Sequence, residues 1–373
     1  MIPFNIPYQN PDLWNDIHHA EKDPRLFRNQ GYYYQEAKNK LSNFWNTSNI
    51  YLTPSCTHAL EIVAHILEIK PGDEIILPSY TYVSTANAFY LKGATLVFAD
   101  VLPNHPSLDI SDVEKKINQK TKAIVLVHYG GIGIDVAAFR KLADQNNILL
   151  IEDAAHAIGA TYNNKALGTF GDFSAFSFHE TKNLGCVQGG ALIVNNPEYI
   201  EKANTITQCG TNRLDFMNKK TDRYSWVSPG TNGVLAEPLC AILSSQLNYL
   251  NQVTQRRKFL WTNYLNALEE IINNRNIQFV QSSESNGHIF YLLLNDSDEK
   301  LRFIKSMYEN GIEVTTHYQA LHQSPFYLKH HDAEHLTQTM KFHDTLVRIP
   351  LYHAMNENEQ SFIIKSTIRF FKK

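Results

Sequence analysis

Short apolar runs alternate with segments of helical spacing over the first 250 residues of the chain. The runs predict strands at 49–53, 74–78, 95–100, 122–128, 148–153, 173–178 and 191–194. Between them, apolar residues three and four positions apart predict helices at about 33–45, 55–67, 79–91, 112–117 and 136–146. Strands that read as near-continuous apolar runs are typical of a mostly parallel sheet covered by helices. The pattern therefore predicts an α/β fold.

The rest of the chain contains both helical spacing and apolar runs typical of strands. One long helix is predicted from 235 to about 268, followed by strands at 277–280 and 288–294 and helices at 300–310 and 359–371. Residues 1 to about 30 are polar and predicted to be irregular, and residues 209–233 are loop-like. We expect a large domain over 1–250 and a smaller α+β domain over 251–373.

Composition narrows the class of protein. The 373 residues are 43% hydrophobic and carry a net charge of -3, so nothing favours a nucleic-acid partner. No apolar run is long enough to span a membrane, and the first residues have no basic-then-apolar signal pattern. The four cysteines form no CxxC pair, which favours reduced thiols and a cytoplasmic location. His331 and His335 have no third partner at metal-site spacing, so we expect surface residues and no metal.

Polar side chains lie just after the carboxyl ends of several predicted strands. Ligands of parallel α/β sheets bind beyond the carboxyl ends of the strands. Five residues lie just after such an end: Thr57, Tyr82, His128, Asp153 and Lys182. We therefore expect a ligand site at this edge of the sheet.

Lys182 follows the aromatic run 173–178 and is the central candidate for the chemistry of this site. A lysine in a pocket wall loses proton affinity through desolvation, and its neutral amine can form a Schiff base with an aldehyde cofactor. The alternative is a solvated lysine in a loop.

Other polar positions have a functional and a structural interpretation each. Asp153 either pairs with a cation such as a protonated pyridine nitrogen or caps a helix. Tyr82 either stacks on a planar ring or packs in the core. The helix start at 55–57 either binds a phosphate or is only capped, and the Ser177 hydroxyl bonds either a phosphate or the backbone. Together these groups match the needs of pyridoxal 5'-phosphate (PLP).

Several segments in order make the chain similar to a known family. They are Thr53-Pro54-Ser55-Cys56-Thr57, Pro71-Gly72-Asp73-Glu74, the run from Pro78 to Ala88, Glu152-Asp153-Ala154-Ala155-His156, Phe176-Ser177-Phe178-His179-Glu180-Thr181-Lys182-Asn183 and Gly210-Thr211-Asn212-Arg213. With these motifs the chain resembles, nearly end to end, the DegT/DnrJ/EryC1/StrS family of sugar aminotransferases. That resemblance implies a fold type I PLP enzyme.

The resemblance also implies roles. Lys182 would bond the cofactor and move a proton, and Asp153 would pair with the ring nitrogen. The remaining cofactor contacts would come from Cys56, Thr57 and Ser177 at the phosphate, Tyr82 on the ring, His156 beside the ring oxygen, and Asn232 reaching the partner subunit's phosphate. A homodimer with shared active sites would follow. His317 and Tyr318 are candidates for contact with the sugar, although a structural hydrogen bond explains His317 equally well.

The implied reaction moves an amino group from L-glutamate, which leaves as 2-oxoglutarate, to a nucleotide-linked keto-sugar. The stretch 177–183 is most similar to that of enzymes acting on dTDP-4-oxo-6-deoxy-D-glucose, which points to surface polysaccharide synthesis such as O-antigen, lipopolysaccharide or common antigen. The alternatives are amination of a 3-keto sugar, a PLP-dependent sugar dehydratase and a non-catalytic PLP-fold protein. Val187-Gln188-Gly189-Gly190 departs from the family's Gly-Glu-Gly-Gly, and the segment after Asn232 lacks its Tyr-Arg.

Overall fold

The computed structural model describes residues 1–274, 284–331 and 335–372. Its main sheet has seven strands in the order β1-β11-β10-β7-β6-β2-β3. Strand β11 runs antiparallel to both neighbours and the other neighbouring pairs are parallel, which confirms the predicted mostly parallel sheet. The strands of this sheet are β1 Ile50–Thr53, β2 Glu74–Pro78, β3 Thr95–Ala99, β6 Thr121–Val127, β7 Leu149–Asp153, β10 Phe173–Ser177 and β11 Gly190–Val194.

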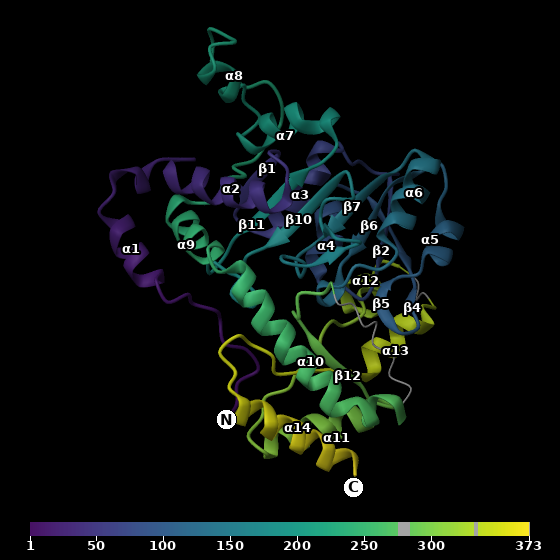
Figure 1. Ribbon diagram of the computed structural model, residues 1–373. Helices are drawn as coiled ribbons and strands as arrows, with labels where there is room; N and C mark the ends of the chain where they lie inside the picture. The colour runs from purple at the N-terminus through teal and green to yellow at the C-terminus, as the bar shows by residue number, and fades with distance from the viewer. Residues whose placement is uncertain (275–283, 332–334, 373) are drawn as a thin grey trace.

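Helices cover both faces of the sheet (Figure 1). They are α1 Leu13–Glu21, η1 Pro24–Phe27, α2 Tyr32–Trp45, α3 Cys56–Ile66, α4 Val83–Tyr90, α5 Ile110–Lys116, η2 Tyr129–Gly131, α6 Val136–Asn146, η3 Pro197–Tyr199, α7 Ile200–Thr207, α8 Arg213–Met217 and α9 Glu237–Leu247. Two small hairpins complete this part: β4 Val101–Leu102 with β5 His105–Leu108, and β8 Thr161–Tyr162 with β9 Lys165–Ala166.

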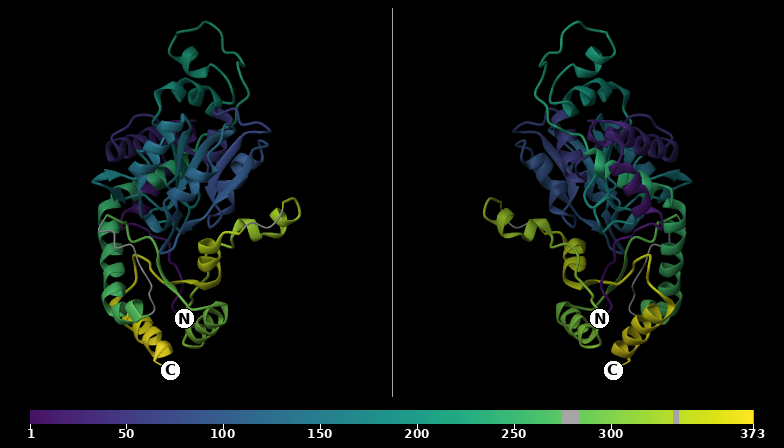
Figure 2. Two further views of the ribbon diagram at one scale, coloured as in Figure 1. Left: turned by 90° about the vertical axis from the view of Figure 1, so that its right-hand side faces the viewer. Right: turned by 90° about the vertical axis from the view of Figure 1, so that its left-hand side faces the viewer.

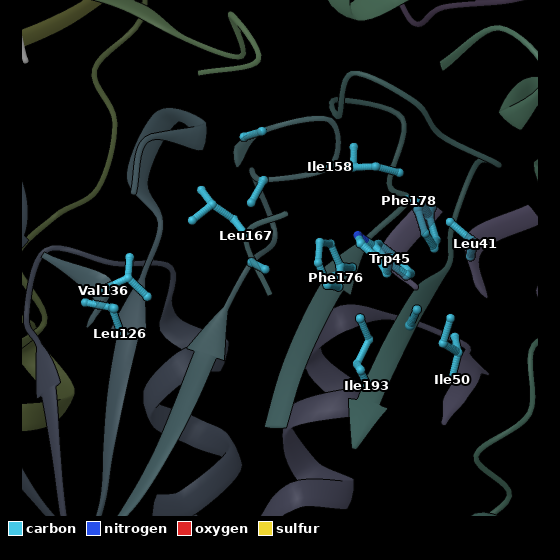
Figure 3. Packing of buried hydrophobic residues seen from close by; sticks show 14 of the residues in the cluster. Leu41, Trp45, Ile50, Leu126, Val136, Ile158, Leu167, Phe176, Phe178 and Ile193 are labelled. Atoms are coloured by element: carbon cyan, nitrogen blue, oxygen red, sulfur yellow. The ribbon is translucent and has the colours of Figure 1, made fainter. Parts of the chain in front are cut away.

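Alternation along the strands divides the core between the two faces. Ile193 and Phe176 pack toward α2, α6 and α9, whereas Leu192 and Ala175 pack toward α3, α4 and α7. On the first face the Trp45 ring lies 4.2 Å from the Phe176 ring, centroid to centroid (Figure 3). Because both faces are apolar, polar function is confined to the strand ends.

A second part of the chain packs below the sheet in Figure 1. It contains α10 Leu250–Asn274, β12 Phe290–Leu293, α11 Ser297–Glu309, η4 Leu321–Gln323, α12 Pro325–Leu328, α13 Thr337–Thr345, β13 Leu346–Ile349 and α14 Glu357–Phe371. Strands β12 and β13 form an antiparallel pair whose side chains share a core with α10, α11 and α14. The predicted strand at 277–280 lies outside the described residues.

Three sequence predictions were wrong. The helix expected over 235–268 is two helices, because Asn248 and Tyr249 bond to the carbonyls three residues back and tighten the chain between α9 and α10. The N-terminal segment expected to be irregular contains α1, which Asp16 ties to Ser245 of α9 by a hydrogen bond of 2.6 Å. The helix expected from 79 begins only at Val83.

The N-terminus lies with the second part of the chain. Ile2 forms a parallel bridge with Ile312, and both termini are at the same end of the molecule (Figure 1). The segment around α8 projects from the end of the molecule opposite the termini, and both views in Figure 2 show this. The division near residue 250 stays a prediction. Among the described residues no helix is both long and apolar enough to cross a membrane.

Candidate functional site

A cavity of about 820 Å³ opens where β7 and β10 end and α3 and α4 begin. Of the five polar residues expected at strand ends, Thr57, Tyr82, Asp153 and Lys182 line this cavity. Cys56, His156 and Ser177 line it as well, and the second part of the chain adds His317 and Tyr318. The structure thus brings together every predicted site residue except His128 and Asn232.

His128 does not belong to this group. Its Nε2 lies 2.7 Å from Oε2 of Glu152, and both side chains are buried away from the cavity. Successive residues of a strand point to opposite faces, so Glu152 and Asp153 at the end of β7 face different surroundings. Our expectation that His128 faces the ligand was wrong for this reason.

Asp153 is the only carboxylate among the described residues that line the cavity. It is 6% exposed and accepts hydrogen bonds from Thr85 Oγ1 at 2.7 Å and from the Ala155 amide at 3.2 Å. Burial raises the pKa of Asp153, and these two donors and the Lys182 charge oppose the rise. A nearby cation would therefore be strongly attracted to this carboxylate.

Lys182 follows β10 on a turn in which its amide donates to the His179 carbonyl at 2.9 Å. Burial lowers the pKa of its amine from 10.5 to about 8, although Cys56 and Asp153 act in the opposite direction. Within the described residues, no hydrogen bond or ion pair occupies this amine. It is therefore available in part as a neutral nucleophile near neutral pH.

The start of α3 faces the cavity with unused backbone donors. Ser55 caps the helix by accepting from the His58 amide at 3.0 Å, so the capping interpretation holds for Ser55. Cys56 and Thr57 remain directed at the cavity, and the first turn carries no acidic residue. A Cβ on Gly190 would lie 2.4 Å from the Ser55 carbonyl carbon, so only glycine lets β11 approach this turn. The result is an open anion site.

Aromatic and imidazole rings form another part of the cavity wall. The His156 ring lies 4.5 Å from that of His288 and 5.8 Å from that of His317, centroid to centroid. Gly130 donates its amide to His156 Nδ1 at 3.3 Å, which places the ring proton on Nε2, 3.3 Å from the Tyr318 hydroxyl. Burial lowers the pKa of His156, so this imidazole is neutral at pH 7.

The positions of three further predicted residues support their expected roles to different degrees. Tyr82 is 58% exposed at the cavity mouth and is not core-packed. His317 lines the cavity and also bonds the Tyr129 hydroxyl through Nδ1 at 2.7 Å, so the structural hydrogen bond is confirmed and the contact with the sugar stays a prediction. Asn232 is exposed and lies outside the cavity, in a bridge with Gln208, so its expected role toward a partner subunit stays a prediction.

Among the residues of the cavity wall that sequence reasoning missed are Phe4, Arg257 and Arg348. Arg348 had a signal, because it is the one charged residue in the apolar run Leu346–Ile349. Arg257 is hidden in the regular pattern of α10, and Phe4 reaches the cavity only through the pairing of the N-terminus with residue 312. Neither could be found from local pattern.

The residues present fit PLP. An unoccupied amine, a buried carboxylate and an open helix start line a single cavity, and these are the groups that an aldehyde, a pyridine nitrogen and a phosphate require.

Comparisons with known proteins agree. The sequence matches the DegT/DnrJ/EryC1/StrS aminotransferase family over residues 16–367. It is 34% identical to the dTDP-3-amino-3,4,6-trideoxy-alpha-D-glucose transaminase of Streptomyces venezuelae, over 72% of this chain and 68% of the relative. A spore coat polysaccharide biosynthesis protein of Bacillus subtilis is 29% identical over 98% of this chain and 96% of its own length.

Solved structures share the fold. A putative sugar aminotransferase from Streptococcus pneumoniae in its PMP form superimposes with a TM-score of 0.90, at 23% identity, over 100% of this chain and 99% of that one. The family match and the Streptomyces venezuelae relative favour a transaminase over the dehydratase and the non-catalytic alternatives. The chain belongs to the DegT/DnrJ/EryC1/StrS aminotransferase family and is a PLP-dependent sugar transaminase.

Proposed function

We propose that this enzyme transfers the amino group of L-glutamate to dTDP-4-oxo-6-deoxy-D-glucose, giving the 4-amino sugar. The observation that carries the transaminase chemistry is the placement of the free Lys182 amine and the buried Asp153 carboxylate in one cavity. The choice of sugar rests on the resemblance of residues 177–183. Amination of a 3-keto sugar is the second candidate, and the name of the Streptomyces venezuelae relative favours it.

In this proposal the cavity residues have different tasks. Bound PLP supplies an electron-withdrawing ring that stabilises negative charge at the reacting carbon. Lys182 would bond the cofactor, and its amine would then hold the proton taken from the donor or sugar carbon and return it. Asp153 keeps the ring nitrogen protonated by accepting its hydrogen bond.

The other contacts fix the ring in place. Thr57, Ser177 and the Cys56 amide hold the phosphate at the start of α3. Tyr82 would cover one ring face, and the neutral His156 would lie beside the ring oxygen. His317 and Tyr318, stacked at 3.7 Å between centroids, face the sugar.

A homodimer would complete the site. Asn232 is not among the residues that line its own cavity, and the segment before it carries exposed Phe216, Met217, Tyr224 and Trp226, the last of them 78% exposed. Apolar side chains in a projecting segment favour burial against another chain. We propose that this segment crosses to a second copy, where Asn232 meets the partner's phosphate site. Sedimentation should then give a dimer, and Trp226→Ser should weaken it.

We place the enzyme in the cytoplasm, in a route to surface polysaccharide such as O-antigen, lipopolysaccharide or common antigen. The test of function uses purified enzyme loaded with PLP. L-glutamate should bleach the yellow colour and release 2-oxoglutarate, and a panel of dTDP-linked 3- and 4-keto sugars should restore it. Locating the new amine by NMR decides between carbon 4 and carbon 3. Failure of every sugar to restore the colour would contradict the proposal.

A further inference from the structure

His288 lies in the cavity wall with one ring nitrogen unpaired, although the residue is only 5% exposed. Its backbone amide donates to Asn286 Oδ1 at 3.1 Å, and its carbonyl accepts from Arg257 Nη2 at 2.8 Å. Its Nδ1 lies 2.7 Å from Oδ1 of Asn183, the residue that follows Lys182. Its Nε2 has no hydrogen-bond partner among the described residues and is not sealed in the protein interior. Every polar atom of His288 except Nε2 is therefore used within the protein.

The hydrogen bonds around Asn183 determine where the ring of His288 carries its proton. The Asn183 side chain donates from Nδ2 to the Asn286 carbonyl at 3.0 Å, and a carbonyl can only accept. Oδ1 of Asn183 is therefore the atom that faces His288, and it accepts the proton carried by Nδ1. Burial lowers the pKa of His288 well below its usual value, so the ring is neutral at pH 7. Its Nε2 is consequently a hydrogen-bond acceptor that faces the cavity.

Asn286 ties this arrangement to the large sheet. Its side-chain amide donates to the carbonyls of His156 and Ile158 at 2.7 and 2.8 Å, in the segment that follows β7. The ring of His288 is thus fixed both by this segment and by the residue that follows Lys182. An acceptor held in place before the ligand arrives costs little entropy on binding.

The imidazoles of His156 and His317 offer no comparable acceptor. Both nitrogens of His156 already have partners within the protein. The Nδ1 of His317 bonds the Tyr129 hydroxyl, which can donate or accept, so this contact does not determine the character of the other nitrogen. Of these three rings, His288 is the one whose free nitrogen must accept.

A ligand that covers Nε2 of His288 must donate a hydrogen bond to it, because a desolvated acceptor without a donor is unfavourable. Two kinds of donor enter the cavity in the proposed reaction: the ammonium group of the amino donor and the hydroxyls of the keto-sugar. Besides burial, the charges of Arg257 and Arg348 lower the pKa of His288, so this part of the wall repels a further cation. A neutral hydroxyl is not repelled, and the charges therefore favour the sugar.

The position of His288 also indicates which hydroxyl it meets. Its ring is held by the residue next to Lys182, so it lies near the carbon that reacts with that amine. The two neighbours of carbon 4 in dTDP-4-oxo-6-deoxy-D-glucose differ in their groups. Carbon 3 bears a hydroxyl, whereas carbon 5 bears a methyl group and the ring oxygen, neither of which can donate.

We propose that Nε2 of His288 accepts a hydrogen bond from the hydroxyl on the carbon next to the reacting carbonyl, which is the carbon 3 hydroxyl of the proposed substrate. His288 is then a specificity-determining residue. It stabilises a keto-sugar with this hydroxyl and disfavours a 3-deoxy sugar, which would leave Nε2 covered without a donor. This inference rests on the proposed function, and it adds the part of the sugar that the cavity recognises.

The test compares three variants of the PLP-loaded enzyme. His288→Asn keeps a donor for Asn183, because an amide nitrogen takes the place of the ring Nδ1, but it has no atom at the place of Nε2. His288→Gln puts an amide oxygen near the place of Nε2. His105→Asn is the matched control, because His105 is a buried imidazole outside the cavity whose Nδ1 lies 2.9 Å from Ser107 Oγ.

The first measurement is a single turnover of the sugar half-reaction. Enzyme bleached with L-glutamate is mixed with dTDP-4-oxo-6-deoxy-D-glucose or its 3-deoxy analogue, and the return of the yellow colour is followed. The wild type should prefer the hydroxylated sugar by about 20-fold, because one hydrogen bond is made or left unmade. His288→Asn should lose this preference, and His288→Gln should recover part of it. Bleaching by L-glutamate should stay within about twofold in both, and His105→Asn should match the wild type in both half-reactions.

A binding measurement separates recognition from chemistry. dTDP-6-deoxy-D-glucose keeps the carbon 3 hydroxyl but has no carbonyl, so it binds without reacting. Calorimetry with the PLP-loaded enzyme should show affinity about 20-fold weaker in His288→Asn and unchanged in His105→Asn. Thermal unfolding of the same samples reports any loss of the fold.

Three results would overturn the inference. A wild type that accepts both sugars equally would show that the hydroxyl is not recognised. A preference that persists in His288→Asn would assign the hydroxyl to another residue. Losses in both half-reactions with a lowered unfolding temperature would make His288 structural. If only a 3-keto sugar restored the colour, only the proposed substrate would fail, because both neighbours of carbon 3 bear hydroxyls and the comparison would use the 2-deoxy and 4-deoxy analogues.

Discussion

The Thr85 hydroxyl donates a hydrogen bond to the Asp153 carboxylate, with 2.7 Å between Oγ1 and Oδ2. Thr85 lies in the first turn of α4 and Asp153 at the end of β7, so the contact joins two of the elements that border the cavity. Thr81 bonds in turn to Thr85 at 2.9 Å between the hydroxyl oxygens. A buried carboxylate needs such donors to stay ionised, and the proposed role of Asp153 requires it to be ionised.

We predict that Thr85→Val slows transamination about tenfold, because a hydrogen bond to a charged group is lost while the side-chain shape is kept. The pKa of Asp153, already raised by burial, should rise further. Thr81→Val, which touches Asp153 only through Thr85, should have a smaller effect. The measurement is kcat under saturating donor and sugar, and a normal rate in Thr85→Val would show that the bond does not matter.

Asp153→Asn should bind PLP but lose most of the rate, since an amide cannot hold the ring nitrogen protonated. In the cofactor-free protein, the same substitution should increase the stability of the fold. Burial raises the pKa of Asp153 in the folded state, so that state binds its proton more tightly, and stability falls as pH rises above about 4. The cofactor-free variant should therefore unfold at a higher temperature than the wild type at pH 7, with the difference vanishing near pH 4. A less stable variant at pH 7 would contradict this.

Much of the large sheet was predictable because its strands are buried on both faces and read as continuous apolar runs, as at Leu149–Asp153. Helix boundaries set by capping or local hydrogen bonds were not predictable. Examples are the late start of α4 and the break before Leu250. The cavity residues at strand ends were predictable from position alone. Phe4 was not, because the pairing of residues 2 and 312 that brings it there leaves no local trace in the sequence.

Lys182→Ala should give a folded protein without transaminase turnover. In the wild type, capture of PLP by the cofactor-free protein should speed up with pH around a midpoint near 8, because only the neutral amine attacks the aldehyde. The folded state releases this proton more readily than the unfolded chain, so stability should rise with pH between about 8 and 10.5. Stopped-flow absorbance and thermal unfolding check both effects. Turnover in Lys182→Ala would refute the role of the amine.

Val187 is one of the positions at which the sequence departs from the pattern of its family. It occupies the place of a family glycine, is 65% exposed and has a φ of 71°, in the left-handed region that β-branched residues avoid. The neighbouring Gln188 and Gly189 line the cavity. The chain therefore keeps the backbone conformation that glycine would allow and bears the strain of a valine in it.

We predict that Val187→Gly stabilises the protein by about 0.5–1 kcal/mol, because about 1–2 kcal/mol of left-handed strain is relieved and part of it is lost to the entropy of glycine. Val83→Gly is the matched control: this exposed valine begins α4 and has no positive φ, so the same change should destabilise by about 0.5–1 kcal/mol. Urea unfolding of the PLP-loaded proteins measures both. If the two variants shifted the midpoint in the same direction, the left-handed conformation at 187 would not be the source of the strain.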